Sequence, residues 1–248
     1  MVSIKQSKFI KSLKIKKYRL REKCFLIEGK KNVLEGITSD CKLRYILGTK
    51  DFISSNQTIL NSNDFDVIEV ASNVLTELGT FKMNNECLAV AEMFEDKIEE
   101  VSFRENIVVL DGVSDPGNLG TIIRTLDWFG MTQLVCSTDS ADLYNPKVIN
   151  ATMGSFTRVK VNYVDLPEFI ESSPLKAYGA DLEGKILHQW KSHDPILLVM
   201  GSESHGISTE VQELLSDRLT IQKIGEAESL NVAIATGIFC QHLKFMNA

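Results

Sequence analysis

The sequence contains no stretch that approaches the roughly 20 consecutive apolar residues of a membrane-spanning helix. Its N-terminus turns basic within eight residues and has no apolar segment behind the charges, so we do not expect a secretion signal. The five cysteines are dispersed, with no Cys-x-x-Cys pair, and the four histidines form no metal-like cluster with them. This odd, scattered set indicates reduced thiols rather than a disulfide framework or a zinc site. We therefore expect a cytoplasmic protein with no membrane partner and no bound metal.

The formal net charge of −6 conceals a strong asymmetry along the chain. Residues 1–50 hold 14 Lys and Arg against 4 Asp and Glu, whereas the remaining residues hold 13 basic and 29 acidic side chains. A globally acidic protein with a basic end commonly keeps that end for a polyanion. A solvated helix face would produce the same asymmetry, so charge alone leaves both interpretations open.

Residues 1–97 are predicted to form a small α/β domain. The first element is a basic helix over residues 7–21, in which Phe9, Leu13 and Leu20 fall on one stripe. Strands are expected at residues 24–29, 44–48, 67–70 and 87–93, and further helices at residues 32–37 and 73–78. The acidic residues 95–100 are expected to link this domain to the next.

Residues 104–248 are predicted to form a second α/β domain. Strands are expected at residues 106–111, 133–136, 158–162, 177–180, 196–200 and 218–222, and helices at residues 121–129, 146–152, 210–215 and from residue 230 onward. Apolar strands that alternate with helices indicate a largely parallel sheet covered on both faces. In such sheets, ligands bind at the carboxyl ends of strands.

The loop after the strand at 106–111 is the first of three candidate ligand loops. Pro116-Gly117 marks a turn, Asn118 is a candidate N-cap, and Gly120 permits close approach of a backbone or a ligand. Arg124 lies six residues beyond Asn118, so its long side chain could reach the same end of the sheet. The loop lacks the Lys-[Ser/Thr] of a P-loop, and the chain has no G-x-G-x-x-G fingerprint.

The second loop, at residues 200–208, follows a strand of five consecutive apolar residues. Gly201 and Gly206 bracket Glu203 and allow backbone amides to face a ligand. The third loop, at residues 221–235, leads to the last helix, where Ser229 is the expected N-cap and Asn231 lies in the first turn. Taken alone, each of the three loops also fits a plain capped helix start.

Taken together and in order, the three loops resemble the signature motifs of the SpoU (TrmH-like) family of RNA 2′-O-methyltransferases. The first is similar to N-x-G-x-x-x-R at residues 118–124, and the second to G-x-E-x-x-G at residues 201–206. The third is similar to S-L-N-V-[S/A]-x-A at residues 229–235. Each motif alone is weak evidence, but three in the family's order over about 120 residues are specific.

The resemblance implies a SPOUT-type domain, an α/β fold with a parallel sheet and a C-terminal trefoil knot, preceded by a small α/β RNA-binding domain. It implies S-adenosyl-L-methionine as the cofactor and a homodimer with the two sites near the interface. The residues expected to bind the cofactor are Met200, Gly201, Glu203, Gly206, Ile221, Ile224, Gly225, Ser229 and Leu230.

The resemblance also implies a catalytic set of Asn118, Arg124, Glu203, Ser229 and Asn231. A guanidinium with a pKa above about 12 is a poor base. We therefore expect Arg124 to bind the target phosphate and to stabilise negative charge on the 2′ oxygen. The residues expected to contact RNA are Lys16, Lys17, Arg19, Arg21, Glu28 and Arg124.

Ribosomal RNA is favoured over transfer RNA as the substrate because the two-domain layout suits it. DNA, which has no 2′-hydroxyl, is not expected as a partner. Two alternatives stay open at this point: a non-catalytic RNA-binding or ribosome-assembly protein that keeps the fold, and a transfer RNA 2′-O-methyltransferase. A nucleotide-dependent enzyme of the Rossmann or P-loop class is disfavoured because both fingerprints are missing.

Overall fold

Two compact units make up the chain, which a computed structural model describes at residues 2–61, 65–82, 84, 86–94 and 101–246. The first unit comprises Met1–Glu95 together with Asp142–Thr157, and the second comprises Asp96–Ala141 with Arg158–Ala248. The domain boundaries predicted from the sequence, 1–97 and 104–248, remain a prediction. In the structure, residues 142–157, which fall within the second predicted domain, pack in the first unit. The linker predicted at residues 95–100 lies outside the described residues.

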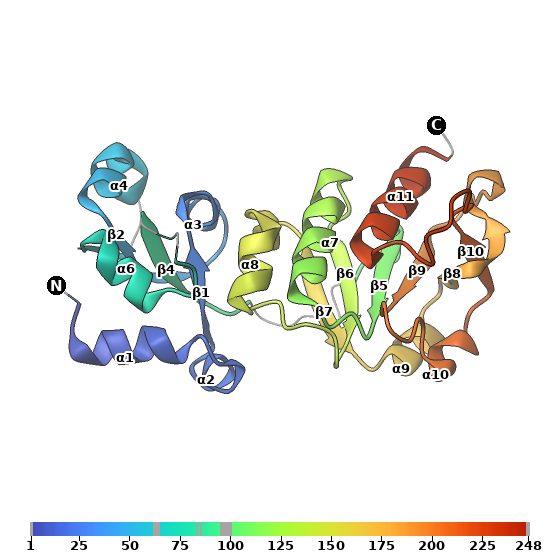
Figure 1. Ribbon diagram of the computed structural model, residues 1–248, viewed down its shortest axis with the longest axis horizontal. Coiled ribbons are helices and arrows are strands. Elements are labelled where there is room, and N and C mark those ends of the chain that lie inside the picture. The colour runs from blue at the N-terminus through green and yellow to red at the C-terminus, as the bar shows by residue number, and fades with distance from the viewer. Residues whose placement is uncertain (1, 62–64, 83, 85, 95–100, 247–248) are drawn as a thin grey trace. The chain divides into compact units, whose positions relative to one another are not determined.

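A four-stranded mixed sheet with strand order β1-β4-β2-β3 forms the centre of the first unit (Figure 1). β4 is antiparallel to β1 and β2, whereas β2 and β3 are parallel. The strands are β1 (Cys24–Glu28), β2 (Leu43–Gly48), β3 (Asp66–Glu69) and β4 (Cys87–Glu92). The helices before residue 96 are α1 (Ile4–Ser12), α2 (Lys16–Glu22), α3 (Lys30–Ile37), α4 (Lys50–Ser55), α5 (Gln57–Asn61) and α6 (Ser72–Leu78). The four predicted strands are therefore confirmed.

The single basic helix predicted over residues 7–21 is wrong, because α1 and α2 are separate helices. Ile15 is extended (φ −106°, ψ 126°) and precedes α2. The Ser12 hydroxyl donates to the Phe9 carbonyl at 2.7 Å, a local bond that competes with helix continuation. Leu20 is 57% exposed, so the expected apolar stripe does not extend into α2. Helices α4 and α5 are absent from the sequence prediction.

Residues 142–157 complete the core of the first unit with α8 (Pro146–Thr152) and the short 3₁₀ helix η2 (Ser155–Thr157). The Phe25 ring of β1 lies 4.9 Å from the Tyr144 ring and 6.1 Å from the Phe156 ring, the latter edge to face. Arg19 of α2 forms a 2.6 Å ion pair with Asp142. This aromatic and ionic packing explains why the segment belongs with β1.

The second unit is a six-stranded sheet with order β10-β8-β9-β5-β6-β7, and every pairing between its strands is parallel. The parallel sheet predicted from the sequence is confirmed. The strands are β5 (Ile107–Asp111), β6 (Gln133–Ser137), β7 (Lys160–Val164), β8 (Lys176–Ile186), β9 (Ile196–Gly201) and β10 (Asp217–Thr220). The helices are α7 (Pro116–Trp128), α9 (Leu166–Ser172), α10 (Thr209–Gln212), α11 (Val232–Phe245) and the 3₁₀ helix η3 (Leu187–Gln189).

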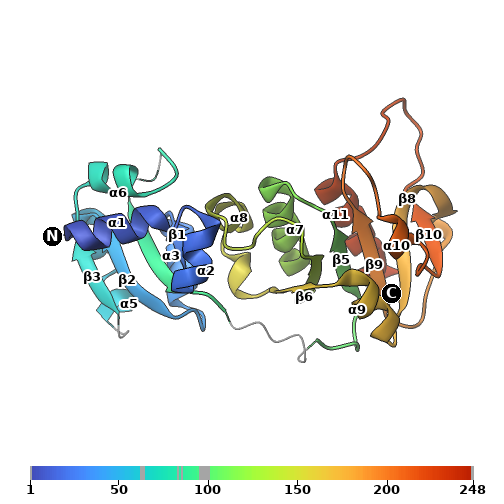
Figure 2. The ribbon, with the colours of Figure 1, turned by 90° about the horizontal axis from the view of Figure 1, so that it is seen from below.

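Helices cover both faces of this sheet (Figures 1 and 2). On one face, α9 and α10 bury Phe169 and Val211 against alternate residues of β5 and β9, among them Val109 and Val199. On the other face, α7 and α11 pack side by side. Helix α9 was not predicted from the sequence, and β8 extends to residue 186, six residues beyond its predicted end at residue 180.

All five cysteines are free and buried, as the scattered spacing predicted. Burial raises the pKa of the Cys41 thiol to about 12, and burial likewise raises the pKa of Cys240 to about 12. These thiols are therefore protonated and unreactive at neutral pH. Within the described residues, no helix combines the length and apolar character needed to cross a membrane.

Candidate active site

Three loops leave the carboxyl ends of β5, β9 and β10, the edge where parallel sheets bind ligands. Because β5 and β9 are paired, with Asp111 opposite Gly201, their loops begin side by side. Asp111 is only 8% exposed, and its Oδ2 accepts a 2.7 Å hydrogen bond from the Ser208 amide. This bond ties the loop after β9 to the end of β5.

The loop after β9 is a tight turn that depends on two glycines. Ser202 and Gly206 exchange backbone hydrogen bonds of 3.0 and 2.9 Å, which close the loop on itself. A Cβ atom at position 201 would lie well inside van der Waals contact with the Gly206 carbonyl group. Gly206 has φ +67°, in the left-handed region that side chains disfavour. The loop therefore presents Glu203 at a fixed place.

Side chains from all three loops meet in a polar trio, which consists of Asn118, Glu203 and Asn231. The Asn118 Nδ2 donates to Glu203 Oε1 in a short hydrogen bond. The Asn231 Nδ2 donates to Asn118 Oδ1 at 3.0 Å and to Glu203 Oε1 at 3.3 Å. The three motifs, whose trio residues lie 85 and 28 residues apart in sequence, are thus joined by one hydrogen-bond network.

The helix caps differ from those predicted. Asp115, rather than Asn118, caps α7 by accepting from the Asn118 amide at 2.8 Å, which leaves the Asn118 side chain free for the trio. Asn231, rather than Ser229, caps α11, because its Oδ1 accepts from the amides of Ala233 and Ile234 at 3.0 and 3.3 Å. The same Asn231 side chain therefore fixes the helix start and, through Nδ2, the other two motifs.

Arg124 projects from α7 as an exposed side chain. At a rise of about 1.5 Å per residue, it lies about 9 Å along the helix from Asn118. It makes no hydrogen bond or ion pair with any residue that the structure describes, and it does not line the pocket below. Within one chain, the trio therefore does not contact Arg124.

A pocket of about 530 Å³ lies between the loops after β9 and β10. Its lining includes all nine residues for which the sequence predicts cofactor contact. Ser229, predicted in both the catalytic and the cofactor sets, lines this pocket and is exposed. The volume falls within the range of about 300–1,000 Å³ typical of sites for ligands of drug size.

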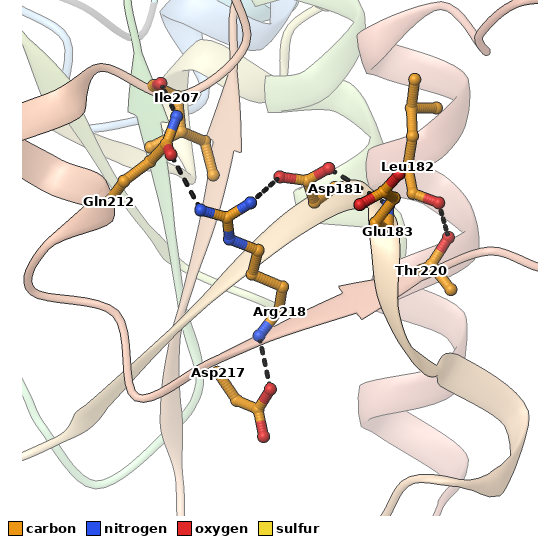
Figure 3. Close-up of polar contacts among 8 residues, drawn as sticks. All are labelled: Asp181, Leu182, Glu183, Ile207, Gln212, Asp217, Arg218 and Thr220. Atoms are coloured by element: carbon orange, nitrogen blue, oxygen red, sulfur yellow. Dashed lines mark hydrogen bonds and ion pairs between the residues drawn. The ribbon is translucent and has the colours of Figure 1, made fainter.

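One wall of the pocket was not predicted from the sequence. Asp181 and Gln212 line it, and Arg218, next to it, donates to Asp181 Oδ2 at 3.2 Å and to Gln212 Oε1 at 2.9 Å (Figure 3). The pairing of β8 with β10 is interrupted after Gly179 and Arg218, and it begins again at Lys185 and Leu219. Residues 180–184 bulge out of the pairing, and the first three of them line the pocket. No sequence pattern signals such an irregularity.

The residues predicted to bind RNA fall into two groups. Lys16, Lys17 and Arg21 are exposed on α2, and the Arg21 guanidinium lies 4.9 Å from the Tyr18 ring centre. Arg19, by contrast, is 3% exposed; besides its ion pair with Asp142, it donates to the Leu13 carbonyl at 3.0 Å. Its assignment to RNA is corrected to a structural role.

Glu28 is likewise corrected. Its side chain is 3% exposed and accepts hydrogen bonds from the Thr80 amide at 2.9 Å and from Asn84 Nδ2 at 3.4 Å. A buried carboxylate that accepts hydrogen bonds from Thr80 and Asn84 is not a surface group for RNA. Arg124, the remaining residue predicted to contact RNA, is exposed as described above.

The chain is similar to known proteins along most of its length. Residues 105–241 match the model of the SpoU rRNA Methylase family, and residues 5–89 match the MRM3-like substrate binding domain. The 23S rRNA (guanosine(2553)-2′-O)-methyltransferase RlmP of Bacillus subtilis is 30% identical over 238 residues, which cover 94% of this chain and 94% of RlmP.

Two solved structures are similar over nearly the whole length. A TrmH-family protein from Porphyromonas gingivalis is 37% identical with a TM-score of 0.85, and 98% of each chain is covered. The AdoMet-bound rRNA methyltransferase from Sinorhizobium meliloti is 25% identical with a TM-score of 0.88, covering 100% of this chain and 98% of that one.

Proposed function

The chain belongs to the SpoU rRNA methylase family, and on that premise we propose that it transfers the methyl group of S-adenosyl-L-methionine to a ribose 2′-hydroxyl of ribosomal RNA. The observation that carries the proposal is the convergence of three motifs on one place. The polar trio links the loops after β5, β9 and β10, and the pocket beside it has a size suited to the cofactor.

The pocket fits the cofactor by its shape and its lining. Ile224 and Leu230 offer apolar surface, and Gly201, where any side chain would collide with Gly206, lets the loop that lines the pocket close tightly. When bound, S-adenosylmethionine supplies a methyl group already activated by its sulfonium. The protein's task is then to hold the ribose oxygen in line, and such positioning contributes about 7–11 kcal/mol of barrier reduction in favourable cases.

Arg124 is proposed to act on the substrate rather than on the cofactor. Its guanidinium binds the target phosphate in a fork and stabilises negative charge that develops on the 2′ oxygen. The 2′ oxygen forms a bond to the methyl carbon as the sulfur–carbon bond breaks, and the hydroxyl proton leaves to water or phosphate. The trio keeps the cofactor loop in register with α7, which carries the arginine.

A homodimer is proposed to complete the site. Ile234, Ile238 and Phe245 are 57%, 38% and 59% exposed, and their spacing puts them on one face of α11. This apolar face lies on the helix that packs beside α7, where Arg124 has no partner within the described chain. A second copy that covered the face would bring Arg124 to the partner's pocket. Sedimentation equilibrium that gave the mass of one chain would contradict the dimer.

RNA is proposed to bind the first unit through the exposed side chains of α2, namely Lys16, Lys17 and Arg21. Support comes from the excess of basic residues in the first fifty and from the match of residues 5–89 to a substrate binding domain. Ribosomal RNA is preferred over transfer RNA because the relative that covers 94% of the chain is named for 23S rRNA. With such a substrate, we propose a cytoplasmic location.

A trefoil knot formed by the segment around β10 and α11 is also proposed. The support is the family membership together with the strand order, in which β10 lies at the sheet edge beside β8 while α11 returns to pack on β9. Slow refolding from urea, followed by recovery of S-adenosylmethionine binding, is the expected behaviour. Refolding within milliseconds would contradict a threaded topology.

The proposed activity is tested by two assays on the full chain. Isothermal titration with S-adenosylmethionine distinguishes an enzyme from a non-catalytic RNA-binding protein, which would release no heat. Incubation with labelled S-adenosylmethionine then compares ribosomal RNA with DNA of the same sequence. We expect label in RNA alone, because DNA lacks the accepting hydroxyl. Label in DNA, or the absence of binding, would contradict the proposal.

A further inference from the structure

We propose that Arg218 is a positioning residue for the S-adenosylmethionine pocket, which it serves by holding Asp181 and Gln212 in place as one wall. The inference rests on the proposed function, since the wall has this role only if S-adenosylmethionine binds in the pocket. Arg218 does not itself line the pocket, whereas Asp181 and Gln212 do. Its action is therefore through those two side chains.

The guanidinium joins three elements in one arrangement (Figure 3). Arg218, on β10, donates Nη1 to Asp181 Oδ2 of β8 at 3.2 Å and Nη2 to Gln212 Oε1 of α10 at 2.9 Å. Gln212 then donates Nε2 to the Ile207 carbonyl at 2.6 Å. A continuous path of hydrogen bonds thus runs from Arg218 of β10 to Ile207, the residue that follows Gly206 in the cofactor loop.

The irregular pairing of β8 and β10 makes this arrangement necessary. Residues 180–184 have no backbone pairing with β10, so the ladder does not fix their position, and the Thr220 hydroxyl of β10 holds only the Leu182 carbonyl, at 3.0 Å. Gly184 lies against the backbone at position 218, where a Cβ would approach the Arg218 carbonyl oxygen to 2.5 Å. Asp181 is held instead by its ion pair with Arg218, and its Oδ1 accepts from the Glu183 amide at 3.2 Å. The side chain of Arg218 thus replaces missing backbone pairing at the pocket wall.

The ion pair between Arg218 and Asp181 is expected to affect ligand binding more than the stability of the fold. The side chains of Arg218 and Asp181 are 45% and 28% exposed, and exposed ion pairs contribute little to the stability of a fold. A wall that is ordered before the ligand arrives, however, lowers the ordering cost of binding. The loop after β9 keeps its second anchor, the hydrogen bond from Ser208 to Asp111, so loss of Arg218 should leave the trio in place.

The experiment compares Arg218→Gln, Arg218→Lys and Gln212→Leu with Lys185→Gln as the matched control. Lys185 pairs with Asp217 at 2.5 Å between the same two strands, is also exposed, and does not line the pocket. Calorimetry should give a Kd for S-adenosylmethionine about five- to tenfold weaker in Arg218→Gln and Gln212→Leu. Lys185→Gln should match the unsubstituted protein.

Kinetics and rescue separate positioning from a merely structural role. We expect the KM for S-adenosylmethionine to rise with the Kd while kcat stays within about twofold, because the trio is untouched. Arg218→Lys should restore part of the affinity, since an ammonium can pair with Asp181 but cannot form the planar fork to Gln212 as well.

Equal Kd values for Arg218→Gln and Lys185→Gln would overturn the proposal, as would unchanged binding by Gln212→Leu. If Arg218→Gln did not fold, Gln212→Leu would decide the outcome alone. Failure of the unsubstituted protein to bind S-adenosylmethionine would instead contradict the proposed function, so the two failures are distinguishable.

Discussion

At the residue scale, Asn231 forms hydrogen bonds through both the oxygen and the nitrogen of its side-chain amide, and the two atoms serve different purposes. Its Oδ1 accepts from the first amides of α11, and its Nδ2 donates to Asn118 and Glu203. An aspartate would retain the first task, since Asp and Asn are equally good N-caps, but it has no donor for the second. It would also bring a second carboxylate next to Glu203. The cap and the trio can therefore be separated by a single substitution.

We predict that Asn231→Asp folds with a melting temperature close to that of the unsubstituted protein but loses methyl transfer by about 100-fold, because misplaced reacting groups cost that much. The matched control is Asn145→Asp, whose Oδ1 caps α8 by accepting from the Lys147 amide at 2.9 Å and contacts no part of the site. Thermal unfolding and transfer rates on both variants provide the test. Full activity in Asn231→Asp would rule out a role for the trio.

Arg124→Lys tests whether the exposed arginine acts through its planar fork or through charge alone. The substitution keeps the positive charge and removes bidentate contact with phosphate. We predict a fall in kcat of at least tenfold with S-adenosylmethionine affinity unchanged, because Arg124 does not line the pocket. Near-complete turnover with unchanged RNA affinity would mean that the bidentate role is wrong.

At the element scale, the strands and the three ligand loops were predictable, and the caps and the bulge were not. Runs such as residues 107–111 and 196–200 are apolar without interruption, which is typical of strands buried on both faces. Caps depend on where the backbone turns, so Asp115 and Asn231 replaced the expected Asn118 and Ser229. The pocket wall at residues 180–184 depends on pairing with β10, which is far away in sequence.

Gly201→Ala tests the tight loop after β9. The added methyl group would meet the backbone of Gly206, which cannot move without breaking the Ser202–Gly206 hydrogen bonds. We predict a loss of stability of about 1–3 kcal/mol, measured by urea unfolding, together with loss of S-adenosylmethionine binding. Gly225→Ala is the control, because a Cβ there meets nothing within 4 Å. Equal stability of the two variants would contradict the close approach.

At the scale of the whole molecule, charge is unevenly distributed along the chain. The first fifty residues carry an excess of basic side chains, and the remaining residues carry an excess of acidic ones. Not every basic side chain in the first unit is available to bind RNA. Lys11 pairs with Glu77 at 2.6 Å, Lys14 donates to the Gly79 carbonyl at 2.5 Å, and Arg19 is buried. Composition predicted the basic end, but only the fold distinguishes the lysines of α2, which have no partner among the described residues, from those that have partners within the first unit.

We predict that Lys16→Gln/Lys17→Gln weakens RNA binding and reduces the slope of log K against log salt by about one unit per lysine. The control, Lys11→Gln/Lys14→Gln, removes the same charge from side chains that already have partners, so its slope should change less. Fluorescence anisotropy over a range of salt concentrations measures both. Equal slopes for the two double variants would contradict α2 as the RNA surface.

The atom that receives the methyl group decides whether the chain is a ribose 2′-O-methyltransferase. Ribosomal RNA is incubated with the protein and S-adenosylmethionine carrying a deuterated methyl group, then digested to nucleosides and analysed by mass spectrometry. We predict a single nucleoside with the deuterated methyl group on its 2′ oxygen, formed by the unsubstituted protein and at least 100-fold more slowly by Asn231→Asp. A deuterated methyl group on a base, or equal rates for the two proteins, would contradict the central claim.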